Sequence, residues 1–182
     1  ENSLCFAERH GASTVVTVFV PKAGGLKAYM RKIQPHVALA EELNVTLAIE
    51  NHGCALDDIR RFGEAAKSAR LGIALAPYHL PQDAERLAQL ITDVGPKLKL
   101  FYAWQHGMGC MKKLPKEQEL LQMPGRGKLD FRPLIEALRK IRYRGFVEIF
   151  MHPVPRGIPI LPTAKQVTAE INRGRKYLES SG

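Results

Sequence analysis

Five apolar, β-branched runs alternate with helical segments along this chain, and this alternation limits the fold more than any other feature. The runs are expected to be strands at residues 13–21, 45–50, 71–76, 98–104 and 145–150. Segments with helical spacing follow them at residues 24–44, 57–69, 81–95, 130–142 and 163–180. Continuous apolar strands joined by helices are typical of a parallel sheet covered on both faces. The sequence therefore predicts an α/β fold of about five parallel (β/α) units.

Individual residues predict where the helices begin and bend. Asp57, Asp130 and Thr163 each stand at the start of a helical segment and are expected to cap it, because their side-chain oxygens can accept backbone N–H bonds. Pro81 suits the first turn of its helix, and Pro35 predicts a kink or break within the segment 24–44.

The bulk composition is that of a globular chain of 182 residues, which predicts one domain over residues 1–182. No apolar run is long enough to span a membrane. Three cysteines without a CxxC pair argue against a disulfide framework and a cysteine-based zinc site, so a reducing cytoplasm is the simplest location. The net charge of +9 favours anionic partners, but the basic residues are scattered, so nucleic acid is an unlikely partner.

Polar residues gather at the carboxyl ends of the expected strands. They are Glu50, Asn51 and His52 after the second strand, Tyr78 and His79 after the third, Gln105 and His106 after the fourth, and Glu148, His152 and Arg156 in and beyond the fifth. Four of the six histidines fall at these ends. In parallel α/β folds, ligands bind at the carboxyl ends of the strands, so these residues predict a common site.

Three stretches carry a resemblance to a known family: "LAIENHG" (47–53), "PYHL" (77–80) and "GRGKLDFRPLIEALRKIRYRGFVEIF" (125–150). In this order they resemble the xylose-isomerase-like superfamily of sugar isomerases and epimerases, over about residues 13–180. The resemblance covers the fourth to the eighth strand of a TIM barrel. Because eight units typically need about 250 residues, the chain is expected to form the C-terminal part of a barrel, with the N-terminal units missing.

The resemblance implies a single divalent ion, Mn, Mg, Co or Zn, held by Glu, Asp, His and Glu. Glu50 matches the first glutamate, Glu148 the last, and His106 is the nearest candidate for the histidine. The aspartate position falls on Ala76, which cannot ligate a metal. The family's two glutamates also move the proton, so Glu50 and Glu148 are the expected catalytic residues, and a bound ion would steady the enediolate.

The remaining polar residues are expected to contact a sugar substrate. The resemblance assigns His79 to a substrate oxygen, and His52, His152 and Arg156 lie at the same strand ends. Trp104 is expected either to pack on the CH face of a sugar or to belong to the core. Glu50 and Glu148 are expected to face one cleft. A long loop at residues 105–128, which carries Lys112 and Lys113, is expected to lie over this cleft.

The expected function is that of a metal-dependent isomerase or epimerase that acts on a sugar or sugar acid. Alanine at position 76, where the resemblance places an aspartate, could impair this activity. Two alternatives stay open: a nuclease related to endonuclease IV, which shares the barrel, and a non-catalytic sugar-binding protein on a decayed barrel. Exposed sheet edges also predict homo-oligomers. "PGRGK" (124–128) is expected to be a tight turn rather than a phosphate cradle, and Cys54 and Cys110 are expected to be bystanders.

Overall fold

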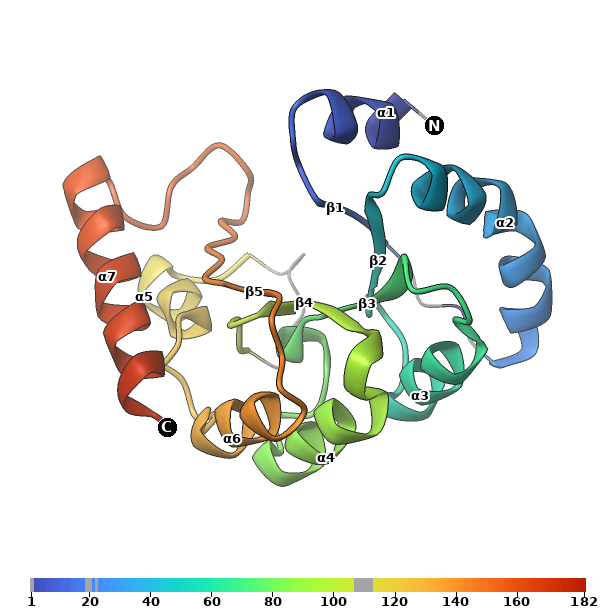
Figure 1. Ribbon diagram of the computed structural model, residues 1–182. Coiled ribbons are helices and arrows are strands. Elements are labelled where there is room, and N and C mark those ends of the chain that lie inside the picture. Colours follow the sequence, from blue (N-terminus) through green and yellow to red (C-terminus); the bar gives the residue numbers. More distant parts are fainter. Residues whose placement is uncertain (1, 19–20, 22, 107–112) are drawn as a thin grey trace. The chain divides into compact units, whose positions relative to one another are not determined.

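The structure, a computed structural model, describes residues 2–18, 21, 23–106 and 113–182 (Figure 1). The chain divides into two compact units, each described by itself below. The first comprises Glu1–Leu75 and Asp93–Phe101, and the second comprises Ala76–Thr92 and Tyr102–Gly182. That both units make one domain stays a prediction.

The strands form one sheet in the order β1-β2-β3-β4-β5, which is their order in the sequence. Their bounds are Thr14–Val18 (β1), Thr46–Glu50 (β2), Leu71–Leu75 (β3), Leu98–Tyr102 (β4) and Phe146–Glu148 (β5). β1 pairs with β2, β2 with β3, and β3 with β4, in each case in parallel. The predicted α/β fold of parallel (β/α) units from part of a TIM barrel is confirmed.

Helices connect these strands, as the alternating pattern predicts. The α-helices are Asn2–Arg9 (α1), Leu26–Glu42 (α2), Leu56–Ala65 (α3), Ala84–Val94 (α4), Lys116–Glu119 (α5), Arg132–Lys140 (α6) and Ala164–Ser180 (α7). Short 3-10 turns lie at Ala23–Gly25 (η1), Pro77–His79 (η2), Gly95–Lys97 (η3) and Leu120–Gln122 (η4). Among the residues that the structure describes, no helix is long and apolar enough to cross a membrane.

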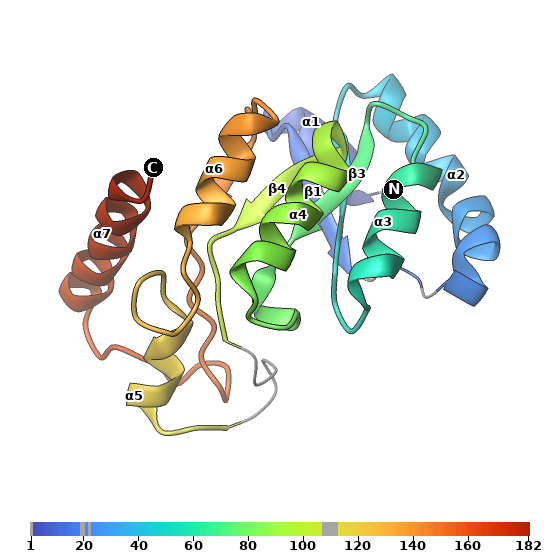
Figure 2. The same ribbon diagram turned by 90° about the horizontal axis from the view of Figure 1, so that it is seen from below.

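The core of the first unit lies between β2, β3 and the helices that follow them. All five residues of β3 are buried, and Ile59 and Phe62 of α3 are fully buried. Helices α2 and α3 lie side by side in both views (Figures 1 and 2). Gly72 is required in β3, because a Cβ there would lie 2.2 Å from the carbonyl oxygen of Lys97. This close approach brings η3 against the strand.

The second unit is held together by α4, α6 and α7. Helices α4 and α6 lie side by side (Figure 2), and residues of both line a shallow groove. α7 is fixed by the buried Glu170, whose carboxylate accepts from Arg126 at 2.6 Å and from Arg173 at 2.6 Å. Arg173 also donates to the carbonyl of Pro124 at 2.7 Å, so α7 is tied to the turn that precedes α6.

The predicted helix starts agree with the structure only in part. Thr163 caps α7, since its hydroxyl accepts from the N–H of Gln166 at 3.3 Å. Asp57 is not the cap of α3, which begins at Leu56 after Ala55. The carboxylate of Asp58 instead accepts from the N–H of Ala55 at 3.0 Å.

Pro81, Pro35 and Asp130 also differ from their predicted roles in the helices. Pro81 lies before α4, which begins at Ala84. Pro35 lies inside α2 without ending it. Asp130 sits one residue before the N-cap of α6, Phe131, yet its carboxylate accepts from the N–H of Arg132 at 3.0 Å. The carboxylate thus satisfies a helix N–H from outside the cap position.

Two segments depart from the predicted pattern more clearly. The expected loop 105–128 contains α5 and η4, and residues 107–112, with Lys112, lie outside the described residues. The fifth strand is shorter than residues 145–150, and the side chains of Phe146 and Val147 are 66% and 40% exposed. β5 ends the strand order, so the described strands give it a neighbour on one side only.

Candidate functional site

Three histidines that follow three strands gather around one aromatic pair in the second unit. Tyr78 and Trp104 stack with ring centroids 3.8 Å apart and an interplanar angle of 16°. His79 meets Trp104 edge to face at 5.2 Å, His106 lies over Tyr78 at 5.7 Å, and His152 lies parallel to Trp104 at 6.0 Å. We call these five residues the histidine–aromatic cluster. It brings together four of the predicted site residues: His79, Trp104, His106 and His152.

Trp104 lies inside this cluster rather than on its surface. Its side chain is 3% exposed, and it forms a small core with Ala76 and Tyr78, against which Tyr102 and Phe150 pack. This burial favours the alternative in which Trp104 belongs to the core. A direct contact between Trp104 and a sugar stays a prediction.

Gln82 fixes the turn that carries Tyr78 and His79. Its amide nitrogen donates to the carbonyls of Pro77 and Leu80, both at 2.8 Å. Its amide oxygen accepts from the backbone N–H of His106 at 3.2 Å. One neutral side chain therefore joins the residues after β3 to the residues after β4.

His106 has an unusual backbone and a partly buried imidazole. Its φ of +144° lies in the region that favours glycine, so this conformation is strained and needs support from its surroundings. Burial lowers the pKa of the imidazole, which favours the neutral form. Its Nδ1 atom is buried and has no hydrogen-bond partner among the described residues.

Gln122 is the centre of a second set of contacts, and sequence reasoning missed it. Its Oε1 accepts from the indole N–H of Trp104 at 2.9 Å and from the backbone N–H of His152 at 2.6 Å. Its Nε2 donates to the carbonyl of Glu119 at 2.7 Å and to that of His152 at 3.2 Å. Four bonds thus exhaust the ordinary capacity of a buried amide. The sequence offers no signal for this role, since Gln122 lies in no recognisable motif.

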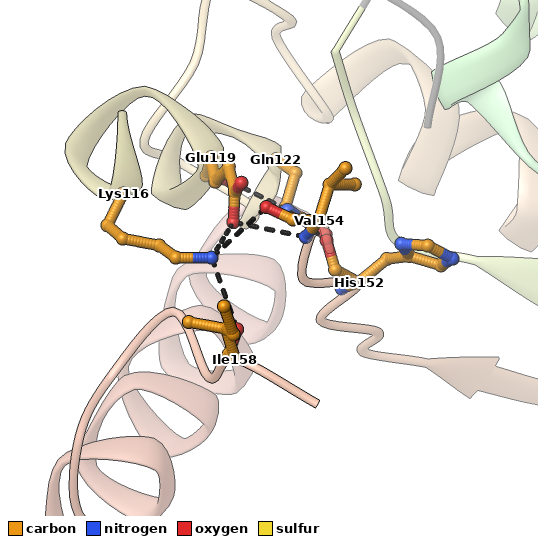
Figure 3. A network of polar contacts seen from close by, with 6 residues as sticks. All are labelled: Lys116, Glu119, Gln122, His152, Val154 and Ile158. Atoms are coloured by element: carbon orange, nitrogen blue, oxygen red, sulfur yellow. Dashed lines mark hydrogen bonds and ion pairs between the residues drawn. The ribbon is translucent and has the colours of Figure 1, made fainter. Parts of the chain in front are cut away.

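Lys116 and Glu119 extend these contacts to the segment beyond β5 (Figure 3). The carboxylate of Glu119 is buried and accepts from the ammonium of Lys116 at 2.9 Å. The same ammonium donates to the carbonyls of Val154 at 3.3 Å and Ile158 at 3.1 Å. In Figure 3 the ring of His152 extends away from these contacts, whereas its backbone takes part in them. The segment that carries His152 and Arg156 is therefore held by its main chain.

His152 and Arg156 contact each other beyond β5. His152 is 7% exposed, and its Nε2 lies 2.9 Å from the guanidinium of Arg156, which is itself exposed. Burial first, and then the positive charge of Arg156, lowers the pKa of the His152 imidazole. Nδ1 of His152 is buried without a hydrogen-bond partner among the described residues. The neutral form of the imidazole is thus favoured, and its Nε2 already contacts Arg156.

Glu50 and His52 belong to the first unit. Glu50 ends β2, where it is in register with Val18 of β1 and Ala74 of β3, and its side chain is partly exposed. The backbone N–H of His52 donates to the carbonyl of Glu50 at 2.9 Å, which makes a tight turn at the strand end. Asn51, between them, is fully buried. That Glu50 and Glu148 share one cleft stays a prediction.

Glu148 is exposed, although its apolar sequence neighbours Val147 and Ile149 favour a buried position. It is the last residue of β5, and its side chain is exposed. Its carbonyl accepts from the N–H of Ala103 at 2.8 Å, which places it beside the end of β4. An exposed carboxylate at a strand end is open to solvent and ligands, because it needs no buried cation to offset its charge.

The metal site that the resemblance implies is not complete among the residues that the structure describes. Among the described residues, no group of three His, Cys, Asp or Glu side chains could hold a metal ion together. Ala76, at the expected aspartate position, is fully buried in the small core. His106 keeps the chemistry of a ligand, since metals bind neutral imidazole. The predicted set of Glu50, His106 and Glu148 stays a prediction.

The sequence "PGRGK" and Cys54, for which no catalytic role was expected, have structural surroundings that agree with that expectation. Gly125 has a φ of +73°, and a Cβ there would lie 2.7 Å from the ring of Tyr177, so this part of "PGRGK" is a tight turn against α7. Burial, with a contribution from Asp58, raises the pKa of the Cys54 thiol to about 12, which disfavours a nucleophilic thiolate. Cys110 lies outside the described residues.

Comparisons with known proteins agree with this arrangement. A family model described as a xylose isomerase-like TIM barrel matches residues 3–177. No curated protein sequence matches the chain.

Solved structures share the fold at low sequence identity. A D-tagatose 3-epimerase-like protein superposes with a TM-score of 0.69 at 16% identity, over 99% of this chain and 67% of that one. D-psicose 3-epimerase, solved in the presence of D-fructose, gives 0.69 at 18% identity, over 97% and 66%. The IolI protein, solved with a zinc atom, gives 0.64 at 15% identity, over 99% and 65%. The chain thus spans about two thirds of the length of these structures, and at these identities the likeness is one of fold.

Proposed function

Because the chain belongs to the xylose isomerase-like TIM-barrel family, we propose that it acts on a sugar or sugar acid as an isomerase or epimerase. One observation carries the proposal: three imidazoles that follow three strands surround the Tyr78–Trp104 pair. A neutral imidazole can donate through one nitrogen and accept through the other, which suits the hydroxyl and carbonyl oxygens of a sugar. Sugar epimerases among the solved structures with this fold support the same substrate class.

In the proposed reaction, the imidazole of His79 holds a substrate oxygen while a carboxylate takes a proton from the carbon next to the carbonyl. An enediolate results, and a carboxylic acid returns the proton. Return to the other face of the same carbon gives an epimer, and return to the neighbouring carbon gives an isomer. Glu50 and Glu148 are the carboxylates that we propose for these transfers.

The resemblance implies a divalent ion, Mn, Mg, Co or Zn, and a structure of this fold holds zinc. In this chain the aspartate position is Ala76, and the described residues assemble no group of three ligands. The steps above therefore rest on the chain's own residues. Metal dependence stays a prediction that titration of the protein with Mn²⁺ tests, and the cytoplasmic location inferred from the cysteines stays one as well.

Deuterium exchange tests the proposed reaction directly. The protein is incubated in D₂O with D-fructose, D-psicose or D-tagatose, each with and without Mn²⁺, and NMR follows deuterium at the carbons next to the carbonyl. Exchange at C3 indicates an epimerase and exchange at C1 an isomerase. Glu148→Gln and Glu50→Gln should each lower the exchange rate by about 100-fold or more, within the range for a lost acid–base group. Glu117→Gln, at an exposed position on α5, is the control.

A second candidate function follows from Ala76, because the implied ligand set is incomplete at that position. A non-catalytic sugar-binding protein would bind a ketose without exchanging its protons. Heat of binding in calorimetry, together with no deuterium uptake under any metal condition, would support this candidate. The absence of both signals with every sugar would contradict both proposals.

A further inference from the structure

The side chain of Arg156 is exposed, and its guanidinium lies 2.9 Å from Nε2 of His152. Within the part of the chain that the structure describes, no ion pair joins it to a carboxylate. Other arginines of the same unit pair with acids: Arg126 and Arg173 with Glu170, and Arg132 with Asp130. The nearby ammonium of Lys116 is paired with Glu119. These cations hold the unit together, whereas Arg156 contacts a residue of the histidine–aromatic cluster.

The contact with Arg156 also determines which ring nitrogen of His152 carries the proton. A guanidinium has five N–H donors and no acceptor, so Nε2 of His152 must accept and the ring proton must sit on Nδ1. Nδ1 is the buried atom that has no hydrogen-bond partner among the described residues. An N–H buried in this way costs free energy unless a partner is supplied. The contact therefore fixes the tautomer of His152 and leaves the remaining N–H groups of the exposed Arg156 side chain for another acceptor.

We propose that Arg156 and His152 form an anion subsite, and that the substrate is an acidic sugar carrying a carboxylate or a phosphate. This inference rests on the proposed function, and it names the substrate class of that site. The remaining N–H groups of Arg156 donate to the oxyanion, since a planar guanidinium matches the geometry of carboxylate and phosphate. Nε2 of His152 holds the guanidinium in place at 2.9 Å, beside the histidine–aromatic cluster.

The test compares three sugars that differ in one group: D-fructose, D-fructuronate and D-fructose 6-phosphate. Isothermal titration calorimetry measures their Kd for the protein at pH 7.5 and a fixed salt concentration. At least one acidic sugar should bind about tenfold or more tightly than D-fructose, because charge-assisted hydrogen bonds are the stronger kind. The carboxylate and the phosphate are separate arms, so the result also tells which oxyanion the subsite takes.

Variants separate a subsite from a general effect of positive charge. Arg156→Gln should abolish the preference for the acidic sugar over D-fructose, whereas Arg156→Lys should keep part of the preference. Arg144→Gln removes one exposed charge elsewhere and should change nothing. Equal Kd values for all three sugars, or a preference that survives Arg156→Gln, would overturn the subsite while the proposed function stands. If none of the sugars binds, the proposed function fails and the subsite with it.

Discussion

The indole N–H of Trp104 and the backbone N–H of His152 donate to the same oxygen, Oε1 of Gln122, at 2.9 and 2.6 Å. One amide thereby fixes the spacing between Trp104, in the segment that follows β4, and His152, in the segment that follows β5. Gln122 is 3% exposed, so water cannot readily replace it. The geometry of the histidine–aromatic cluster should therefore depend on this side chain.

Gln122→Leu should lower the free energy of unfolding by about 2 kcal/mol or more, because it leaves two buried N–H donors without acceptors. Urea denaturation measures this change. The chain has one tryptophan, so the fluorescence of Trp104 reports its surroundings directly. The emission should change in Gln122→Leu. Gln118→Leu, on the exposed side of α5, is the matched control. Equal stability of the two variants would contradict the assigned role.

Gly127→Ala should destabilise the protein by about 1–3 kcal/mol, the usual effect of forcing extra atoms into a packed region. A Cβ at this position would lie 2.7 Å from Oε1 of Gln105 and 2.7 Å from the carbonyl of Leu121. Gln105 Oε1 accepts from the N–H of Leu129 at 2.9 Å, so that bond should be lost as well. Thermal melting measures the effect. Gly24→Ala, where nothing lies within 4 Å, should melt at nearly the wild-type temperature.

Stability should fall as the pH drops below about 6.5, the ordinary pKa of histidine. Burial and the charge of Arg156 lower the pKa of His152 in the folded protein. The unfolded chain then binds more protons than the folded one in this range, so acid favours unfolding. The stability is fully present above the unfolded pKa and is lost as the pH falls toward the folded pKa.

Urea denaturation between pH 5 and 7 checks this dependence. His152→Gln removes the titrating group and should make the slope of unfolding free energy against pH shallower. His36→Gln, at an exposed position of α2, should keep the wild-type slope. Parallel slopes for the two variants would show that His152 does not control the acid sensitivity.

Ala76→Asp should tighten Mn²⁺ binding at least tenfold, since it restores the carboxylate that the resemblance places there. In the absence of metal it should lower stability by about 1–3 kcal/mol, because Ala76 is fully buried against Tyr78 and Trp104. Calorimetry at neutral pH measures the affinity, and Glu148→Gln is the negative control. Unchanged affinity in Ala76→Asp would show that this chain uses another ligand set.

Much of the fold could be predicted from the sequence because the buried strands are continuous apolar runs. Leu71–Leu75 is buried at every position, and its helix-flanked pattern predicts a parallel strand without ambiguity. α5 could not be predicted, since four residues, Lys116–Glu119, are too few to show a helical period. The exposure of Glu148 also escaped prediction. Its neighbours are apolar, but β5 ends the strand order and leaves them exposed.

The sequence predicts the histidines of the candidate site but not the glutamines that hold them in place. His79, His106 and His152 follow strands, and the topology alone places them at one end of the sheet. Gln82, Gln105 and Gln122 were not found as supports, because their roles depend on partners distant in sequence. Gln122, for example, binds His152 across 30 positions of the chain. No periodicity or motif encodes such a pairing.

Three glutamines connect the segments that follow β3, β4 and β5. Gln82 binds the backbone of His106, Gln105 binds those of Met123 and Leu129, and Gln122 binds that of His152. Amide side chains do not ionise, so a change of pH does not change the charge of these connections in the folded protein. The spacing of the three segments therefore does not depend on the protonation of the side chains that join them. A pH dependence of ligand binding would then arise from groups other than these three glutamines.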